Sequence, residues 1–203
     1  MKVYLLAAAF CGLILAATQA DAAVEFNLRR AGFGKTITQT APNPAGGNVS
    51  LTLTASAAGA KKDPYVVQTG FGTGIYTPKG DNSLLTALAV DGLGPNETLH
   101  LTFNKSFKIE TICFNWVDKK DSIIIRDGNG TILFNDKLKS PLLTLNVPFS
   151  TSYSFTAPDS KSEWLVTAVK GQVIPEPSTA LIWSALGVGA LVWRRRKTAL
   201  QKS

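Results

Sequence analysis

Cysteine, histidine and methionine are scarce in this chain of 203 residues, which has two cysteines, one histidine and one methionine. Cys11 lies in an apolar leader, so Cys113 is the only cysteine in the body of the chain. A small exported domain often stores pairs of cysteines as disulfides, and this one has no pair to oxidise. We interpret Cys113 as a small buried apolar residue of a strand, because free cysteine packs in that way.

Patterns typical of active sites are also lacking. One histidine and one cysteine do not supply the four ligands of a zinc site, and no Gly-x-Ser-x-Gly turn is present. His100 alternates with leucines, so we expect a strand residue rather than a catalytic base. The prediction is therefore a protein that is not an enzyme. A polysaccharide lyase or hydrolase is the third alternative, since its paired carboxylates would meet only in space.

The body lacks a helical apolar period, and apolar residues alternate with polar ones at 49–54 and 98–103. Asp127-Gly128-Asn129-Gly130 predicts a hairpin between strands at 122–126 and 131–134. The remaining predicted strands are 107–117, 142–147, 152–156 and 163–169, and the predicted long loops are 41–47 and 70–82. About eight to ten short strands predict an all-β fold, an antiparallel β-sandwich that is jelly-roll-like.

Charge is distributed unevenly along the chain. The net charge is +7, yet the body between residues 24 and 174 has fifteen Lys and Arg against twelve Asp and Glu, a net of +3. Much of the excess lies in a terminal basic cluster of Arg194, Arg195, Arg196 and Lys197. Because the body has no basic stripe interleaved with aromatics, we expect no nucleic-acid partner.

The amino terminus resembles a secretory signal peptide. Lys2 precedes an apolar stretch at 3–17, and small residues follow it in the A-x-A pattern of cleavage sites. We predict a signal peptide at 1–22 with cleavage after Ala22, and cleavage after Ala20 is the alternative. An uncleaved N-terminal anchor is the other interpretation. The β-sandwich ectodomain then occupies residues 23–172.

The carboxyl terminus, residues 173–203, has three ordered parts: a motif at 174–178, an uncharged apolar stretch at 179–193 and a basic tail at 194–203. As a helix the apolar stretch would span roughly 22 Å, which is short for a bilayer that usually takes about 20 residues. We still predict a single transmembrane helix there. The cluster Arg194, Arg195, Arg196 and Lys197 acts as the topology stop and keeps this end on the cytoplasmic side.

These three parts resemble the PEP-CTERM sorting signal of Gram-negative bacteria. The processing motif consists of Pro175, Glu176, Pro177 and Ser178. The resemblance implies an exosortase-like membrane transpeptidase as partner and an exported chain that spans the inner membrane transiently. The protein would then reach the cell surface or the extracellular matrix. A permanent anchor is the alternative, and the basic tail argues against a GPI signal.

These observations predict a non-catalytic structural or adhesive surface protein. The alternative is a carbohydrate-binding module that engages exopolysaccharide through loop aromatics such as Tyr65, Phe71 and Tyr76. No cofactor is required, and calcium is the one candidate, because loop oxygens are its ligands. The candidate ligands are Asp118, Asp121, Asp127 and Asn129. Ordinary turn chemistry is the other explanation for these four residues.

Overall fold

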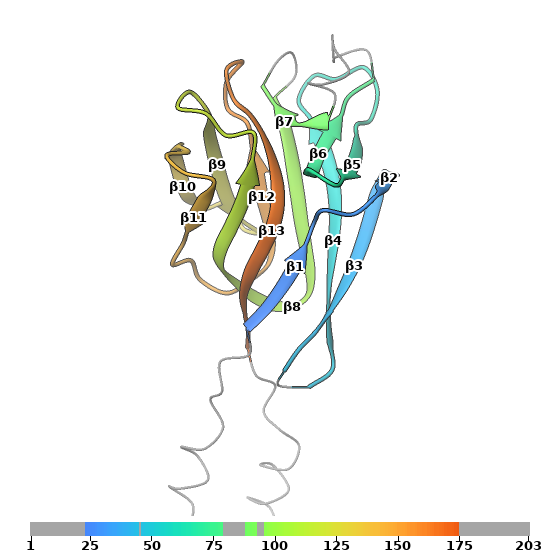
Figure 1. Cartoon of the computed structure of the whole chain (residues 1–203), viewed down its shortest axis with the longest axis vertical. Helices are drawn as coiled ribbons and strands as arrows, with labels where there is room; N and C mark the ends of the chain where they lie inside the picture. Colours follow the sequence, from blue (N-terminus) through green and yellow to red (C-terminus); the bar gives the residue numbers. More distant parts are fainter. Residues whose placement is uncertain (1–22, 45, 79–87, 93–95, 175–203) are drawn as a thin grey trace, which may run out of the picture.

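Strands make up most of the chain that the structure describes (Figure 1). This structure is a computed structural model, and it describes residues 23–44, 46–78, 88–92 and 96–174. In the described chain the strands are β1 (Ala23–Asn27), β2 (Gly32–Gly34), β3 (Thr36–Pro42), β4 (Asn48–Ala57), β5 (Tyr65–Thr69), β6 (Gly72–Tyr76), β7 (Val90–Asp91), β8 (Glu97–Asn115), β9 (Ser122–Asp127), β10 (Ile132–Lys137), β11 (Leu142–Thr144), β12 (Ser150–Thr156) and β13 (Glu163–Val173). Within these residues there is no α-helix, and so none long and apolar enough to cross a membrane.

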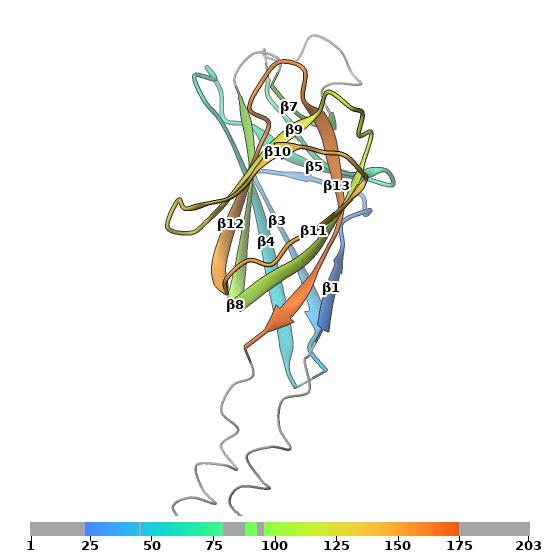
Figure 2. The same cartoon turned by 90° about the vertical axis from the view of Figure 1, so that its left-hand side faces the viewer.

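The long strand β8 connects two layers of the sheet. Its first part, residues 97–103, lies between β4 and β12, and β3, β9 and β10 extend that layer. Its second part, residues 107–115, lies between β13 and β11. β13 in turn pairs with β1, β6 and β7, and β5 and β2 follow β6. Figure 2 shows β8 turning at the lower end of the molecule from one layer into the other.

The apolar core lies between these two layers. Alternation along β4 and the first part of β8 points Leu51, Leu53, Leu99 and Leu101 inward, and all four are fully buried. The facing layer contributes a larger set of buried residues, namely Phe26, Phe107, Ile109, Ile112, Phe114, Trp164, Val166 and Val169. Burying a side chain of this size stabilises the fold by about 1.5–3 kcal/mol, so the period-two pattern determines which face of each layer is interior.

The predicted all-β antiparallel fold is confirmed, and so is the β9–β10 hairpin at 127–130. Two details of the strands and loops predicted from the sequence were wrong. The stretches 98–103 and 107–117 belong largely to one strand, β8, because it continues through its bend. The predicted loop at 70–82 contains β6, whose glycines hid its strand pattern. The jelly-roll arrangement stays a prediction. Cys113 is free and only partly buried on β8.

The ends of the described body lie side by side. β1 runs antiparallel to the end of β13, with Ala23 opposite Gln172 and Val24 opposite Gly171. β13 also packs closely against β8, since a Cβ at Gly171 would collide with the carbonyl oxygen of Lys108. Figure 1 shows β1 beginning and β13 ending at the lower end, whereas β2, β5 and β6 lie in the upper half.

Candidate functional site

Most of the predicted processing residues lie outside the described residues. These are Ala20, Ala22, Pro175, Glu176, Pro177, Ser178, Arg194, Arg195, Arg196 and Lys197. The predicted transmembrane stretch at 179–193 lies outside them as well. The chain leaves the described body at Ile174, whose backbone N–H donates to the carbonyl of Ser106 at 3.3 Å. The motif therefore follows directly after β13.

The four candidate calcium ligands fall into two separate groups. Asp121 immediately precedes β9 and Asp127 ends it, so the strand holds their backbones roughly 20 Å apart. Asp127 Oδ1 accepts hydrogen bonds from the backbone N–H groups of Asn129 and Thr131, both at 2.9 Å. These contacts are those of an ordinary hairpin turn. One ion bound by all four residues does not fit this arrangement.

The other group is an acidic turn in which Asp121 is buried, Glu163 is partly buried and Asp118 is exposed. Asp121 accepts from the backbone N–H of Asp118 at 2.5 Å and of Glu163 at 2.8 Å. Burial raises the pKa of Asp121, and burial together with the charge of Asp121 raises the pKa of Glu163. Across the described parts of the chain, no group of three or more His, Cys, Asp or Glu side chains is arranged to hold a metal ion. Calcium binding stays a prediction.

The outward face of β3, β4, β8 and β12 consists mainly of hydroxyl side chains. In register across the strands they are Thr36, Thr38, Thr40, Ser50, Thr52, Thr54, Ser56, Thr98, Thr102, Ser152, Ser154 and Thr156. Cross-strand pairs such as Thr98 and Thr156, whose hydroxyl oxygens lie 2.9 Å apart, stabilise this face.

His100 lies within this hydroxyl face. Its Nε2 is 2.7 Å from Ser56 Oγ, which is the spacing of a nucleophile and its base. Burial lowers the pKa of His100, so the ring is neutral at pH 7. In the residues described, no carboxylate hydrogen bonds to His100 to orient the ring. The pair has one contact of a hydrolytic triad and lacks the orienting carboxylate.

Three aromatic side chains stack on the outside of β2, β5 and β6; we call them the outer aromatic cluster. The rings of Phe33 and Tyr65 lie 4.9 Å apart and 14° from parallel, and Tyr76 lies 6.3 Å from Phe33 and 6.5 Å from Tyr65. The register explains the grouping, because Phe33 pairs with Val67 and Tyr65 pairs with Tyr76 on one face. Phe33 is 63% exposed.

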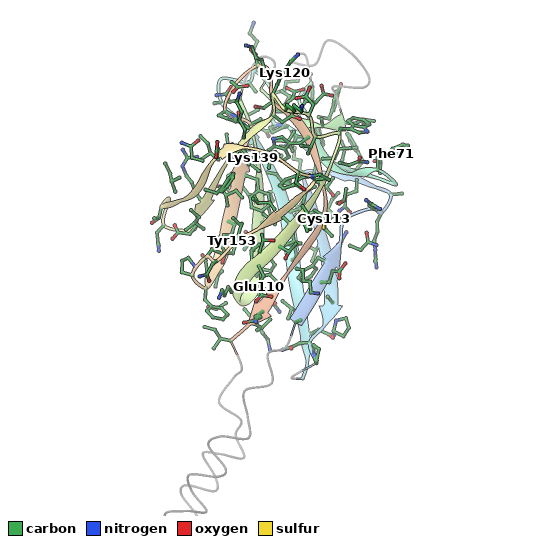
Figure 3. The ribbon with its side chains drawn as sticks, turned by 60° about the vertical axis from the view of Figure 1, so that its left-hand side comes forward. Phe71, Glu110, Cys113, Lys120, Lys139 and Tyr153 are labelled. Carbon is green, nitrogen blue, oxygen red and sulfur yellow. The ribbon has the colours of Figure 1, made fainter. Side chains whose placement is uncertain are left out.

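A second exposed aromatic pair lies at the other end of the β5–β6 hairpin. The rings of Phe71 and Trp116 are 6.3 Å apart, and both side chains are exposed. Trp116 has a φ of 61°, a left-handed conformation that is uncommon for a bulky residue. Asn115 holds the pair together by accepting from the backbone N–H of Trp116 and donating to the carbonyl of Phe71. Figure 3 shows Phe71 at the edge of the molecule.

A basic groove adjoins the outer aromatic cluster; we call it the lysine groove. It comprises Lys35, Lys61, Lys62 and Asp63 and reaches Tyr65. Lys35 Nζ lies 2.7 Å from Asp63 Oδ2, and this contact raises the pKa of the lysine and lowers that of the carboxyl. The groove therefore has an excess of positive charge beside an exposed aromatic surface.

Sequence reasoning found only part of this surface. It named Tyr65, Phe71 and Tyr76, and the structure brings two of them together while Phe71 contacts Trp116 instead. Phe33 was missed, although a lone phenylalanine between Gly32 and Gly34 is a poor pattern for a core strand. The lysines were missed because Lys35 is distant in sequence from Lys61 and Lys62.

Comparison with known proteins identifies the carboxyl end. Residues 173–197 match the model of the PEP-CTERM protein-sorting motif. This segment contains the processing motif, the apolar stretch and the basic cluster, so the predicted resemblance is confirmed. The motif supports an exported protein sorted by exosortase-type machinery, with transit through the membrane before surface display. No curated protein matches the chain.

Proposed function

We propose that this chain is an exosortase-processed cell-surface or matrix protein whose β-structured body has a non-catalytic, adhesive or structural role. The observation that carries the proposal is the pairing of β1 with β13, which places Ala23 opposite Gln172. Both connections to the export signals therefore leave from one end of the body. A body tethered there presents its other half, which includes the outer aromatic cluster, to the surroundings (Figure 1).

The carboxyl segment acts in sorting. The apolar stretch at 179–193 stops in the inner membrane, and Arg194, Arg195 and Arg196 stay in the cytoplasm. Pro175 and Pro177 disfavour a helix in the motif, because proline fixes φ and lacks a backbone N–H for helix formation. The exosortase-like enzyme then reaches the motif just outside the bilayer.

The intact mass of the protein isolated from cells tests this route. We expect an amino terminus at Ala23 and a carboxyl terminus near Pro177. A matched variant, Glu176→Ala, should retain the full carboxyl end while the signal peptide is still removed. A wild-type mass that ends at Ser203 would show a permanent anchor and contradict processing.

The second candidate function is carbohydrate binding, and the exposed outer aromatic cluster favours it. Phe33 is exposed beside the half-buried rings of Tyr65 and Tyr76, and exposed apolar patches often mark binding sites. The apolar C–H face of a pyranose packs well on such a ring. The ligand that we propose is exopolysaccharide. Binding to a glycan array, measured with and without a calcium chelator, tests both the function and its calcium dependence. No sugar bound in either condition would contradict it.

A further inference from the structure

We propose that the lysine groove and the outer aromatic cluster form one binding site for an anionic polysaccharide. Sugar rings would pack on Phe33, and the acid groups of the polymer would contact Lys35, Lys61 and Lys62. This inference rests on the carbohydrate-binding function proposed above, and it names the chemical class of the ligand.

The groove is a continuous concave surface. One hollow of about 310 Å³ is lined by Lys35, Lys62 and Asp63 together with residues 55–57, 60 and 64. A second hollow of about 410 Å³ is lined by the same three residues with Lys61, Tyr65 and Pro78. The two hollows meet around the Lys35–Asp63 ion pair. Together they have room for more than one sugar residue, as an extended chain requires.

The positive charge of the groove favours an acidic ligand over a neutral one. The described residues that line it include three ammonium groups and one carboxylate, and that carboxylate is already engaged with Lys35 at 2.7 Å. Over the described ranges, no Asp or Glu carboxylate forms an ion pair with Lys61 or Lys62. Ammonium groups that lack an internal counter-ion form charge-assisted hydrogen bonds with incoming carboxylates, and these bonds are about twice as strong as neutral ones. A neutral sugar would leave that interaction unused.

The outer aromatic cluster adjoins the lysine groove and supplies the apolar part of the site. Tyr65 links the two parts, since it lines the larger hollow and also stacks on Phe33 at 4.9 Å. Phe33 is 63% exposed, and its outer face is available to a ligand. A uronic-acid chain carries a C–H face and a carboxylate on every ring, so one chain satisfies both surfaces. The site also lies in the half of the body away from Ala23 and Ile174, which favours a polymer outside the cell over the membrane surface (Figure 1).

Titration calorimetry on the full chain in detergent tests the proposal. The probes are an oligogalacturonate hexamer and its fully methyl-esterified form, which has the same rings without charge. We expect the acid to bind at least about tenfold more tightly than the ester, and raising the salt concentration to weaken the acid alone. The double variant K61Q/K62Q should reduce the affinity for the acid to that for the ester. F33A should weaken both probes.

The controls distinguish failure of this inference from failure of the carbohydrate-binding function. K119Q/K120Q removes the same charge from a different loop, whose Lys120 lies at the upper end in Figure 3, and it should leave binding unchanged. Equal affinity for both probes, unaffected by K61Q/K62Q, would overturn the anionic class while sugar binding stands. Binding of neither probe would overturn both proposals. Binding to anionic phospholipid vesicles with no affinity for the hexamer would show a membrane site instead.

Discussion

The described body has two groups of stacked aromatic side chains, one between its two layers of strands and one on its outer surface. Inside, Phe103 and Phe107 lie 4.3 Å apart and 10° from parallel, and Phe26 and Tyr153 contact them edge-on. Outside, Phe33 and Tyr65 stack with nearly the same geometry, at 4.9 Å and 14°.

The two groups differ in what surrounds them. Phe107 is fully buried, whereas Phe33 is 63% exposed. Stacking alone is worth about 0.5–1.5 kcal/mol in either place, and only the interior rings also lose their contact with water. The interior group therefore contributes to folding, and the outer one retains apolar surface for a ligand. Three predictions test this difference, and a fourth tests the proposal of a non-catalytic body.

The largest effect is expected from Phe107→Ala. Removing a fully buried ring beside the bend of β8 leaves a cavity, and the free energy of unfolding should fall by about 3–5 kcal/mol. Equilibrium urea unfolding of the full chain in detergent measures it. A loss below about 1 kcal/mol would show that the interior ring is no more important to stability than an exposed one.

The hydroxyl group of Tyr153 makes stability depend on pH. Its oxygen lies 2.6 Å from the carbonyl oxygen of Phe107 and 2.8 Å from that of Pro148, so its single proton is shared between these two acceptors, and burial raises its pKa to about 12. A pKa raised from 10 in the folded state means that the stabilisation is complete below pH 10 and is lost as the pH rises to 12. The free energy of unfolding should therefore fall by about 2–3 kcal/mol across this window.

Tyr153→Phe is the control for the expected loss of stability between pH 10 and pH 12. Lysines titrate in the same range, so the difference between the two proteins isolates the tyrosine. The variant should be less stable than the wild type at pH 8 by about 1–2 kcal/mol, because the buried carbonyl groups of Phe107 and Pro148 lose the one donor that they share. Identical slopes for both proteins between pH 10 and 12 would contradict the assignment.

A smaller effect is expected from Phe33→Ala. The substitution removes one exposed ring and its stacking on Tyr65, so the free energy of unfolding should change by about 1 kcal/mol or less. The same urea experiment measures it. A loss as large as that of Phe107→Ala would mean that Phe33 supports the fold, and the distinction between the two groups would fail.

No effect is expected at the Ser56–His100 pair on the outer hydroxyl face. Because no carboxylate among the described residues orients His100, Ser56 should not react with a fluorophosphonate probe, as judged by mass spectrometry of the labelled chain. A serine hydrolase run in parallel shows that the probe is active. Labelling that disappears in Ser56→Ala would contradict the proposal of a non-catalytic body.

The sequence predicted the strands with the clearest alternation and turn chemistry. Leu51 and Leu53 in β4 and Gly130 in the β9–β10 turn are examples, because period-two burial and positive φ are local requirements. It did not predict β6, where glycine at positions 72 and 74 leaves little apolar pattern, or the continuity of β8 through its bend. Those features depend on neighbouring strands that are distant in sequence.

The candidate site was predicted less completely. The aromatic residues Tyr65 and Tyr76 were named, but their contact with Phe33 follows from the register of β2, β5 and β6. The four candidate calcium ligands are close together in the sequence: Asp118, Asp121, Asp127 and Asn129. In the structure β9 separates the first two from the last two, because a strand extends about 3.3 Å per residue. Side chains close in sequence were thus placed apart, and distant ones together.

By itself the sequence determined the sorting signal and the β character of the body. Both depend on order along the chain, since a sorting motif and an alternating strand are recognised from consecutive residues. Only the tertiary structure decided that both ends of the body meet, and that Phe33 joins Tyr65 beside Lys35, Lys61 and Lys62. The reason is physical: strand register and layer packing bring together residues tens of positions apart, and no local pattern encodes that distance.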